Sequence, residues 1–114
     1  MGKLIQDLKD LGIYDQTAIS ISADHGENQG ELNILGDHQT ADYITNRIPL
    51  IVRWPGITDY VAGSERDSFH YNLDLTATLA DLLGADQPNN WDGQIFAANL
   101  SEKTNLGRDF VILS

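Results

Sequence analysis

Two acid–imidazole pairs lie in the first forty residues, Asp24-His25 and Asp37-His38. The first pair follows a β-branched run and precedes Gly26, so we expect it at the end of a strand, where the glycine lets the chain turn. Consecutive side chains of a strand point to opposite faces, so both groups can reach one ion only beyond the strand's end. An oxygen and a nitrogen ligand suit calcium, manganese, zinc or iron. The pair predicts half of a metal site; the alternative is an aspartate capping a loop beside a half-exposed histidine.

The second pair lies within residues 24–46, a segment without helical or strand periodicity. A long irregular segment of this kind is typical of a functional loop. His38 can complete a metal site or, kept cationic by Asp37, donate to an anionic substrate. The alternative for His38 is an ordinary surface turn. Glu27 and Glu31 of the same segment are either groups that support the site or solvated loop acids.

The elements that must position these residues follow from the spacing of apolar side chains. We predict helices at 3–12 and 72–83, strands at 17–23 and 48–54, and a last strand at 110–113. Asn72 or Asp74 is expected to cap the second helix, whose leucines form an apolar stripe at 75, 79, 82 and 83. This order predicts an α/β fold with a mainly parallel sheet flanked by helices.

The composition is that of a globular protein, with 41% hydrophobic and 21% charged residues in 114. We expect one domain, residues 1–114, with a modest core and a radius of gyration of about 13–14 Å if compact. The formal charge of −10 disfavours nucleic acid and anionic membranes as partners. No cysteine is present, and the sequence shows neither a signal peptide nor a transmembrane stretch, so the location stays unknown.

Several runs of sequence, taken in order, resemble the sulfatases of the alkaline phosphatase superfamily. These runs are LGIYDQTAI at 11–19, SADHGE at 22–27, GDHQTAD at 36–42, RIPLIVRWPG at 47–56, LDLTATL at 73–79 and WDG at 91–93. The Asp-His-Gly tripeptide also recurs in related phosphohydrolases and mutases. Combined with the strand at 47–56 and the helix motif at 73–79, it indicates a sulfatase.

The resemblance implies part of an α/β/α sandwich and a calcium-dependent sulfuric ester hydrolase. In that family the Asp-His pair binds the divalent ion, which would fall to Asp24 and His25. The ion would neutralise the sulfate oxygens and fix the nucleophile. His38 occupies the place where many members carry a sulfate-binding lysine, so it would contact the substrate oxyanion or protonate the leaving group. A sulfated small molecule or sugar would be the substrate.

Two features of the family pattern do not occur in the sequence. It contains no Cys/Ser-x-Pro-x-Arg or Cys/Ser-x-Ala-x-Arg motif, from which the family makes its formylglycine nucleophile, and no N-terminal Asp-Asp pair. We therefore expect weak metal affinity and no turnover by this chain alone. One alternative within the enzyme class is a phosphodiesterase or phosphonate hydrolase. The other is a non-catalytic acidic α/β module that covers its sheet edges by forming a homo-oligomer.

Overall fold

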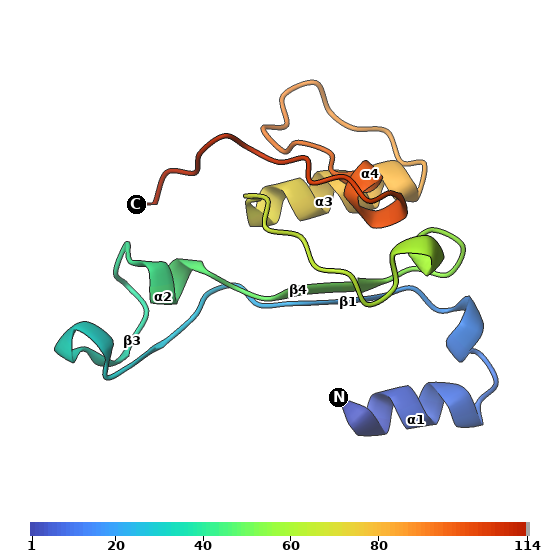
Figure 1. The fold of residues 1–114 in the computed structure, drawn as a ribbon, viewed down its shortest axis with the longest axis horizontal. Helices are drawn as coiled ribbons and strands as arrows, with labels where there is room; N and C mark the ends of the chain where they lie inside the picture. Colours follow the sequence, from blue (N-terminus) through green and yellow to red (C-terminus); the bar gives the residue numbers. More distant parts are fainter. Residues whose placement is uncertain (114) are drawn as a thin grey trace.

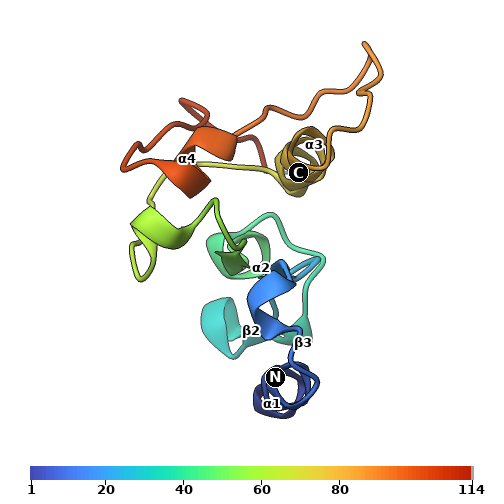
Figure 2. The same cartoon turned by 90° about the vertical axis from the view of Figure 1, so that its right-hand side faces the viewer.

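The computed structural model describes residues 1–113. Strands β1 (Ile19–Ser22) and β4 (Leu50–Arg53) form a central ribbon with α1 (Gly2–Asp10) on one side. Helices α3 (Asn72–Leu82) and α4 (Ala97–Ser101) lie on the other side (Figures 1 and 2). This arrangement confirms the α/β class and the helices on both sides of the strands.

The direction of the paired strands differs from the sequence prediction. Strand β1 pairs with β4 antiparallel, with Ser22 opposite Leu50 and Ile19 opposite Arg53. The segment between the strands leaves β1 and enters β4 at the same end of the ribbon. A parallel pair would need a connection that crosses to the opposite end. Within residues 1–113 both strand pairs are antiparallel, so the prediction of a mainly parallel sheet is wrong for this chain.

The long segment between β1 and β4 contains structure that the sequence pattern did not indicate. Strands β2 (Asn28–Gln29) and β3 (Leu35–Asp37) form a short antiparallel hairpin with a register shift. A 3-10 turn, η2 (Glu31–Asn33), closes the hairpin, and α2 (Tyr43–Asn46) follows it. Strands of two and three residues are too short to show an alternation of apolar and polar side chains.

Two further 3-10 turns, η1 (Tyr14–Gln16) and η3 (Asp59–Val61), complete the element order. The strand expected at 110–113 does not form, because no other strand within residues 1–113 lies beside it to supply its ladder of hydrogen bonds. The segment is instead attached through one side chain, since the Tyr71 hydroxyl donates to the Ile112 carbonyl and accepts from the Ile112 N–H.

The core is smaller than a chain of this length usually buries. The buried apolar side chains among the described residues are Val61, Ala77 and Phe96. The radius of gyration is 16.2 Å, against the roughly 13 Å expected of a compact domain of this length. The expected modest core is therefore only partly formed, and much apolar surface faces outward.

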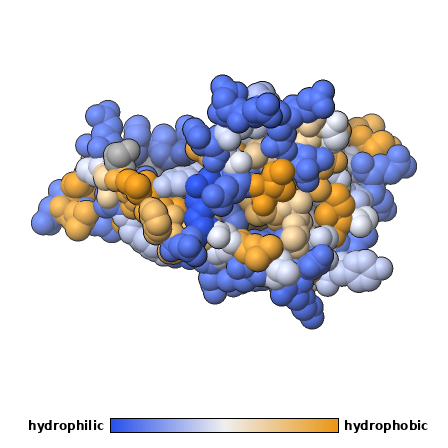
Figure 3. All heavy atoms as spheres, turned by 90° about the horizontal axis from the view of Figure 1, so that it is seen from above, coloured by the Kyte–Doolittle hydropathy of each residue, from blue (hydrophilic) through white to orange (hydrophobic). Residues whose placement is uncertain are grey.

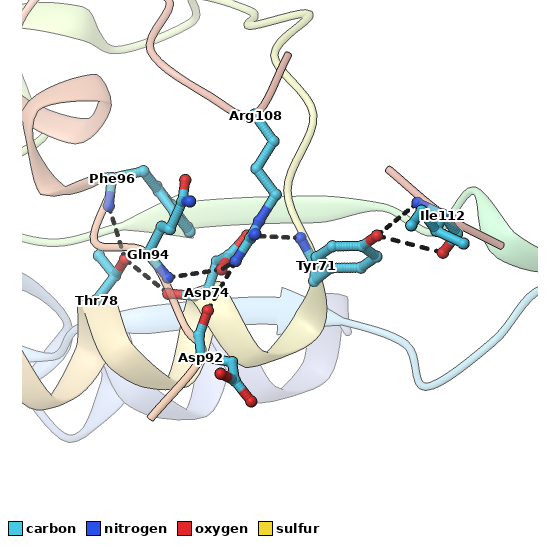
Figure 4. A network of polar contacts seen from close by, with 8 residues as sticks. All are labelled: Tyr71, Asp74, Thr78, Asp92, Gln94, Phe96, Arg108 and Ile112. Carbon is cyan, nitrogen blue, oxygen red and sulfur yellow. Dashed lines mark hydrogen bonds and ion pairs between the residues drawn. The ribbon is translucent and has the colours of Figure 1, made fainter. Parts of the chain in front are cut away.

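Helix α3 is anchored through its polar side rather than through its leucine stripe. Asp74 and Thr78 have no exposed surface, whereas the stripe leucines within α3 are only half-buried and Leu83, the residue after the helix, is 71% exposed. Figure 4 shows why: the Asp74 carboxylate accepts from Arg108 through Nε at 2.9 Å and Nη2 at 2.6 Å. It also accepts from the N–H groups of Tyr71 and Gln94. Burial acts to raise the pKa of Asp74, but the Arg108 guanidinium and the two N–H donors lower it overall.

His70 lies next to this network and behaves as a packing residue. Its Nε2 lies 2.9 Å from the Ser68 hydroxyl, and its ring contacts Phe96 with centroids 4.3 Å apart. Burial lowers the pKa of His70, which favours the neutral ring. The contacts of His70 with Ser68 and Phe96 are those of a packing residue.

Candidate metal and oxyanion site

The predicted ligands Asp24 and His25 lie just beyond the end of β1. Asp24 Oδ1 accepts from the His25 N–H at 3.0 Å, and Asp24 Oδ2 lies 3.8 Å from His25 Nε2. Two ligands of one cation, each about 2.1–2.5 Å from it, are roughly 3–4 Å apart. The pair therefore has a spacing that one ion can bridge, while the carboxylate itself stays 90% exposed.

The second ring nitrogen of His25 is already engaged. Nδ1 lies 2.7 Å from the Gly26 carbonyl oxygen, which can only accept, so Nδ1 carries the proton. The lone pair is then on Nε2, the atom that faces Asp24. A histidine that ligates a metal commonly donates its other ring N–H to a carbonyl in this way. The donors of Asp24 and His25 thus fit a divalent cation.

The charge of Asp24 is favoured by its surroundings. Hydrogen bonds from the backbone N–H groups of Asp24 itself and of His25 lower its pKa, and the neighbouring imidazole contributes in the same direction. Asp24 is therefore an ionised, exposed carboxylate at neutral pH, as a metal ligand must be.

Gly26 is needed for a reason other than a turn. Its N–H donates to the Thr45 carbonyl at 2.7 Å, and a Cβ placed on it would lie 2.1 Å from the Ile44 carbonyl oxygen. Its φ does not fall in the left-handed region where six other glycines lie. The tripeptide ends in glycine because the backbone of α2 packs directly against it.

His38 lies directly beside His25. The two rings stack with centroids 3.9 Å apart and planes 12° from parallel. The sequence prediction paired His38 with Asp37, but Asp37 accepts from the Gln39 N–H, and the carboxylate facing His38 is Glu27, with Oε2 3.3 Å from Nδ1. That expectation is corrected: the Asp37 side chain turns back to its own loop.

A buried hydrogen-bond network holds this loop together. Asn28, fully buried, donates through Nδ2 to the Thr40 hydroxyl and to Asp42 Oδ2, both at 3.1 Å. Asp42 caps α2 by accepting from the N–H groups of Ile44 and Thr45. The Thr40 hydroxyl and then the Asn28 amide lower the pKa of Asp42 to about 2. The network fastens the start of β2, next to Glu27, to the segment after β3, which carries His38.

The first residue of α3 attaches the helix to the same strand end. The Asn72 amide donates to the carbonyl oxygens of Ala23 and Asp24, at 3.3 and 3.5 Å. Of the two residues expected to cap α3, Asp74 does so by accepting from the Tyr71 N–H. Asn72 instead contacts the segment that carries the metal-ligand candidates.

A sequence profile of the Sulfatase family matches residues 1–85, about three quarters of the chain. The chain belongs to the sulfatase family.

Individual sulfatase-family relatives agree with this assignment. The extracellular sulfatase SULF-1 homolog of Drosophila melanogaster is 28% identical over 107 residues, which are 94% of this chain and 9% of that protein. A structure solved with its substrate D-glucosamine-2-N,6-O-disulfate superposes with a TM-score of 0.83 at 27% identity, covering 96% of this chain and 22% of that one.

A phosphonate monoester hydrolase from Silicibacter pomeroyi has a similar fold, with a TM-score of 0.79 and 31% identity. The superposed region covers 96% of this chain and 21% of the hydrolase. The chain thus spans a fifth or less of the length of the first relatives and about a fifth of these structures.

The structure brings together more of the candidate site than residue types alone indicated. Asp24, His25 and His38, all predicted from the sequence, lie beside one another, and Glu27 joins them as the partner of His38. Glu31, the other acid considered, accepts from the Gln29 N–H within the hairpin. The role of Glu27 depends on the register of β2 and β3, for which the sequence gives no signal.

Proposed function

We propose that this chain supplies part of the metal and sulfate site of a sulfuric ester hydrolase. Asp24 and His25 would be two ligands of a divalent cation, calcium in the family the chain resembles. The single observation that carries the proposal is the 3.8 Å approach of Asp24 Oδ2 and His25 Nε2, with Nδ1 of the same ring held by the Gly26 carbonyl.

His38 would bind an oxygen of the sulfate group or protonate the leaving group. Its ring lies against that of His25, so an anion held by the cation would come within reach of it. Glu27 orients the ring for this role, because its Oε2 lies 3.3 Å from Nδ1 and can accept from that nitrogen. When bound, the cation would neutralise charge on the sulfate oxygens.

The nucleophile of such a reaction is not among these residues. The 114 residues contain no cysteine and no Ser-x-Pro-x-Arg or Ser-x-Ala-x-Arg run. We therefore propose that the chain by itself binds divalent cations weakly and does not turn over sulfate esters. The substrate class we propose, a sulfated sugar, is supported by the disulfated glucosamine bound in the similar structure.

A chimera tests this proposal. Residues 1–113 would replace the aligned segment of the sulfatase solved with D-glucosamine-2-N,6-O-disulfate, and hydrolysis of that substrate would be measured. We expect activity in the chimera and a loss in kcat/KM of about 10²-fold or more for Asp24→Ala, His25→Ala and His38→Ala. His70→Ala is the control, because His70 lies in the packing network near α3.

Circular dichroism first establishes that each chimera is folded. A folded chimera without activity, or one whose three site variants match the parent, would contradict the proposal. If the chimera does not fold, binding of Mn²⁺ by the isolated chain at Asp24 and His25 decides the question instead.

A phosphonate or phosphodiester hydrolase is the second candidate, favoured by the structural similarity to the phosphonate monoester hydrolase. The same cation and imidazole would then hold a phosphonate oxygen in place of a sulfate oxygen. Assaying the chimera with a phosphonate monoester and a sulfate ester of the same leaving group separates the two by the ratio of kcat/KM.

A non-catalytic, self-associating module is a third candidate, supported by the outward apolar surface. Leu35, Ile51 and Phe110 are 78%, 59% and 69% exposed. Figure 3 shows several apolar groups on the face that carries α3 and α4. No helix among residues 1–113 combines the length and apolarity needed to span a bilayer. Light scattering with metal determination tests this candidate: it requires a stable dimer without a tightly held ion, and a monomer with bound calcium would exclude it.

A further inference from the structure

Three metal-ligating side chains meet where the β2–β3 hairpin opens. The register places Asn28 opposite Asp37, so the residue before the first, Glu27, lies across from the residue after the second, His38. His25 reaches the same point from the end of β1. One ligand atom from each of His25, Glu27 and His38 lies within 4.8 Å of the others.

We propose that His25, Glu27 and His38 form a binding site for a transition-metal ion of the zinc class. The donors are two imidazole nitrogens and one carboxylate oxygen, a set that zinc uses where a fourth position stays open to water. Imidazole suits zinc, copper, iron and nickel, whereas calcium takes six to eight oxygens. This donor set shares His25 Nε2 with the Asp24–His25 pair, so one ion occupies it at a time, but it adds Glu27 and His38 and favours a different metal.

The free atoms of the three side chains are consistent with chelation. His25 has its lone pair on Nε2, because Nδ1 donates to the Gly26 carbonyl. Glu27 Oε2 and His38 Nδ1 already lie 3.3 Å apart, a separation that two ligands of one ion have. All three side chains are 36–44% exposed, and an ion can therefore reach them from solvent.

Hydrogen bonds fix the backbone that carries the three donor side chains. Asn28, the neighbour of Glu27, is fully buried and hydrogen-bonded to Thr40 and Asp42, which follow His38. The Gly26 N–H is bonded to α2, which fixes the backbone next to His25. The side chains are free to adjust while their attachment points stay fixed.

Binding requires one change, which makes the proposal testable. A nitrogen lone pair lies in the plane of its imidazole, so two stacked rings cannot both direct one at the same ion. Ligands of a tetrahedral zinc ion lie roughly 3.3–3.5 Å apart, so the donors must also close in from separations of up to 4.8 Å. The exposed ring of His38 must therefore rotate out of the stack, which disturbs no buried group.

The experiment is a titration of the 114-residue chain with Co²⁺, followed by its visible d–d absorption, and then displacement of Co²⁺ by Zn²⁺. We expect one ion per chain and a dissociation constant at least about 10-fold higher in His25→Ala, His38→Ala and Glu27→Gln. The ring proton resonances of His25 and His38 should shift on adding Zn²⁺, as the stack opens. His70→Ala should bind as the parent does.

The Asp24→Asn variant separates this site from the proposed sulfatase site. We expect it to lower Co²⁺ affinity less than Glu27→Gln or His38→Ala does, because Asp24 lies 3.8 Å from His25 Nε2 but is outside the donor set. Parent-like affinity in both Glu27→Gln and His38→Ala would overturn the proposal. So would affinity lost in Asp24→Asn alone, or the absence of a tetrahedral Co²⁺ spectrum in a chain that circular dichroism shows to be folded. Failure of Asp24 to bind Mn²⁺ would leave these expectations unchanged, because the two proposals share only His25.

Discussion

Replacing Gly26 by alanine should separate α2 from the end of β1. A Cβ at this position would lie 2.1 Å from the Ile44 carbonyl oxygen and 3.1 Å from the Ile44 carbonyl carbon, whereas ordinary contacts begin at 3.4 Å. Both neighbouring atoms belong to the backbone, so no side chain can rotate away. The helix must retreat by about 1.3 Å at this contact.

The magnitude follows from two terms. Forcing a methyl group into a packed site costs typically about 1–3 kcal/mol. Loss of the hydrogen bond from the Gly26 N–H to the Thr45 carbonyl, 2.7 Å in the native chain, adds about 1 kcal/mol. We expect Gly26→Ala to lower the free energy of unfolding by about 2–4 kcal/mol, a large part of the roughly 5–15 kcal/mol typical of a domain.

Urea denaturation followed by circular dichroism measures this loss at 25 °C. The matched control is Gly2→Ala, which adds the same methyl group at the start of α1, where no atom lies within 4 Å. The control should be neutral or more stable by up to about 1 kcal/mol, because alanine favours helix. A loss below about 0.5 kcal/mol in Gly26→Ala would refute the close approach of α2 as the reason for this glycine.

Three further predictions concern α3 and the loop network. Asp74→Asn should lower the free energy of unfolding by about 3–5 kcal/mol, because it breaks the buried ion pair with Arg108. The control Asp81→Asn, at an exposed position of α3, should change it by less than about 0.5 kcal/mol. Equal effects of the two variants in urea melts would contradict the role of this ion pair in holding α3. Gly93→Ala should cost about 1–3 kcal/mol in the same assay, because a Cβ there would lie 2.5 Å from the Leu73 carbonyl oxygen, and a neutral result would argue against that packing. Asp42 has a pKa of about 2 when folded and 3.8 ordinarily, so the stability it contributes is complete above about pH 4 and lost as the pH falls through about 2. Titration of the Asp42 carboxyl followed by NMR measures its pKa, and a value at or above 3.8 would contradict the hydrogen bonds from Thr40 and Asn28.

The elements that form from local periodicity were predictable from the sequence. Helices α1 and α3 begin and end within one or two residues of the predicted bounds, and β1 and β4 lie inside the predicted strands. The leucine spacing identified which face of α3 is apolar but not which face has a neighbour. The buried face is set by Arg108, whose position 34 residues after Asp74 leaves no signal in a local pattern.

The candidate site likewise has a part that follows from the local sequence and a part that does not. Asp24 and His25 are adjacent in the chain, so their convergence depends only on the strand ending before them, and this was predicted. The stacking of His38 on His25 and the pairing of Glu27 with His38 depend on how β2 and β3 align. That register involves five residues and a bulge, too few for a sequence pattern to specify.

The central claim, that Asp24 and His25 share a divalent cation, is tested most directly by paramagnetic relaxation with Mn²⁺. The ion is added in small amounts to the isotopically labelled chain, and NMR line widths are followed residue by residue. We expect the Asp24 carboxyl and His25 ring signals to broaden first, Ca²⁺ to reverse the broadening, and Asp24→Asn to abolish it. Early broadening confined to other acidic residues, with Asp24 and His25 unaffected, would contradict the account.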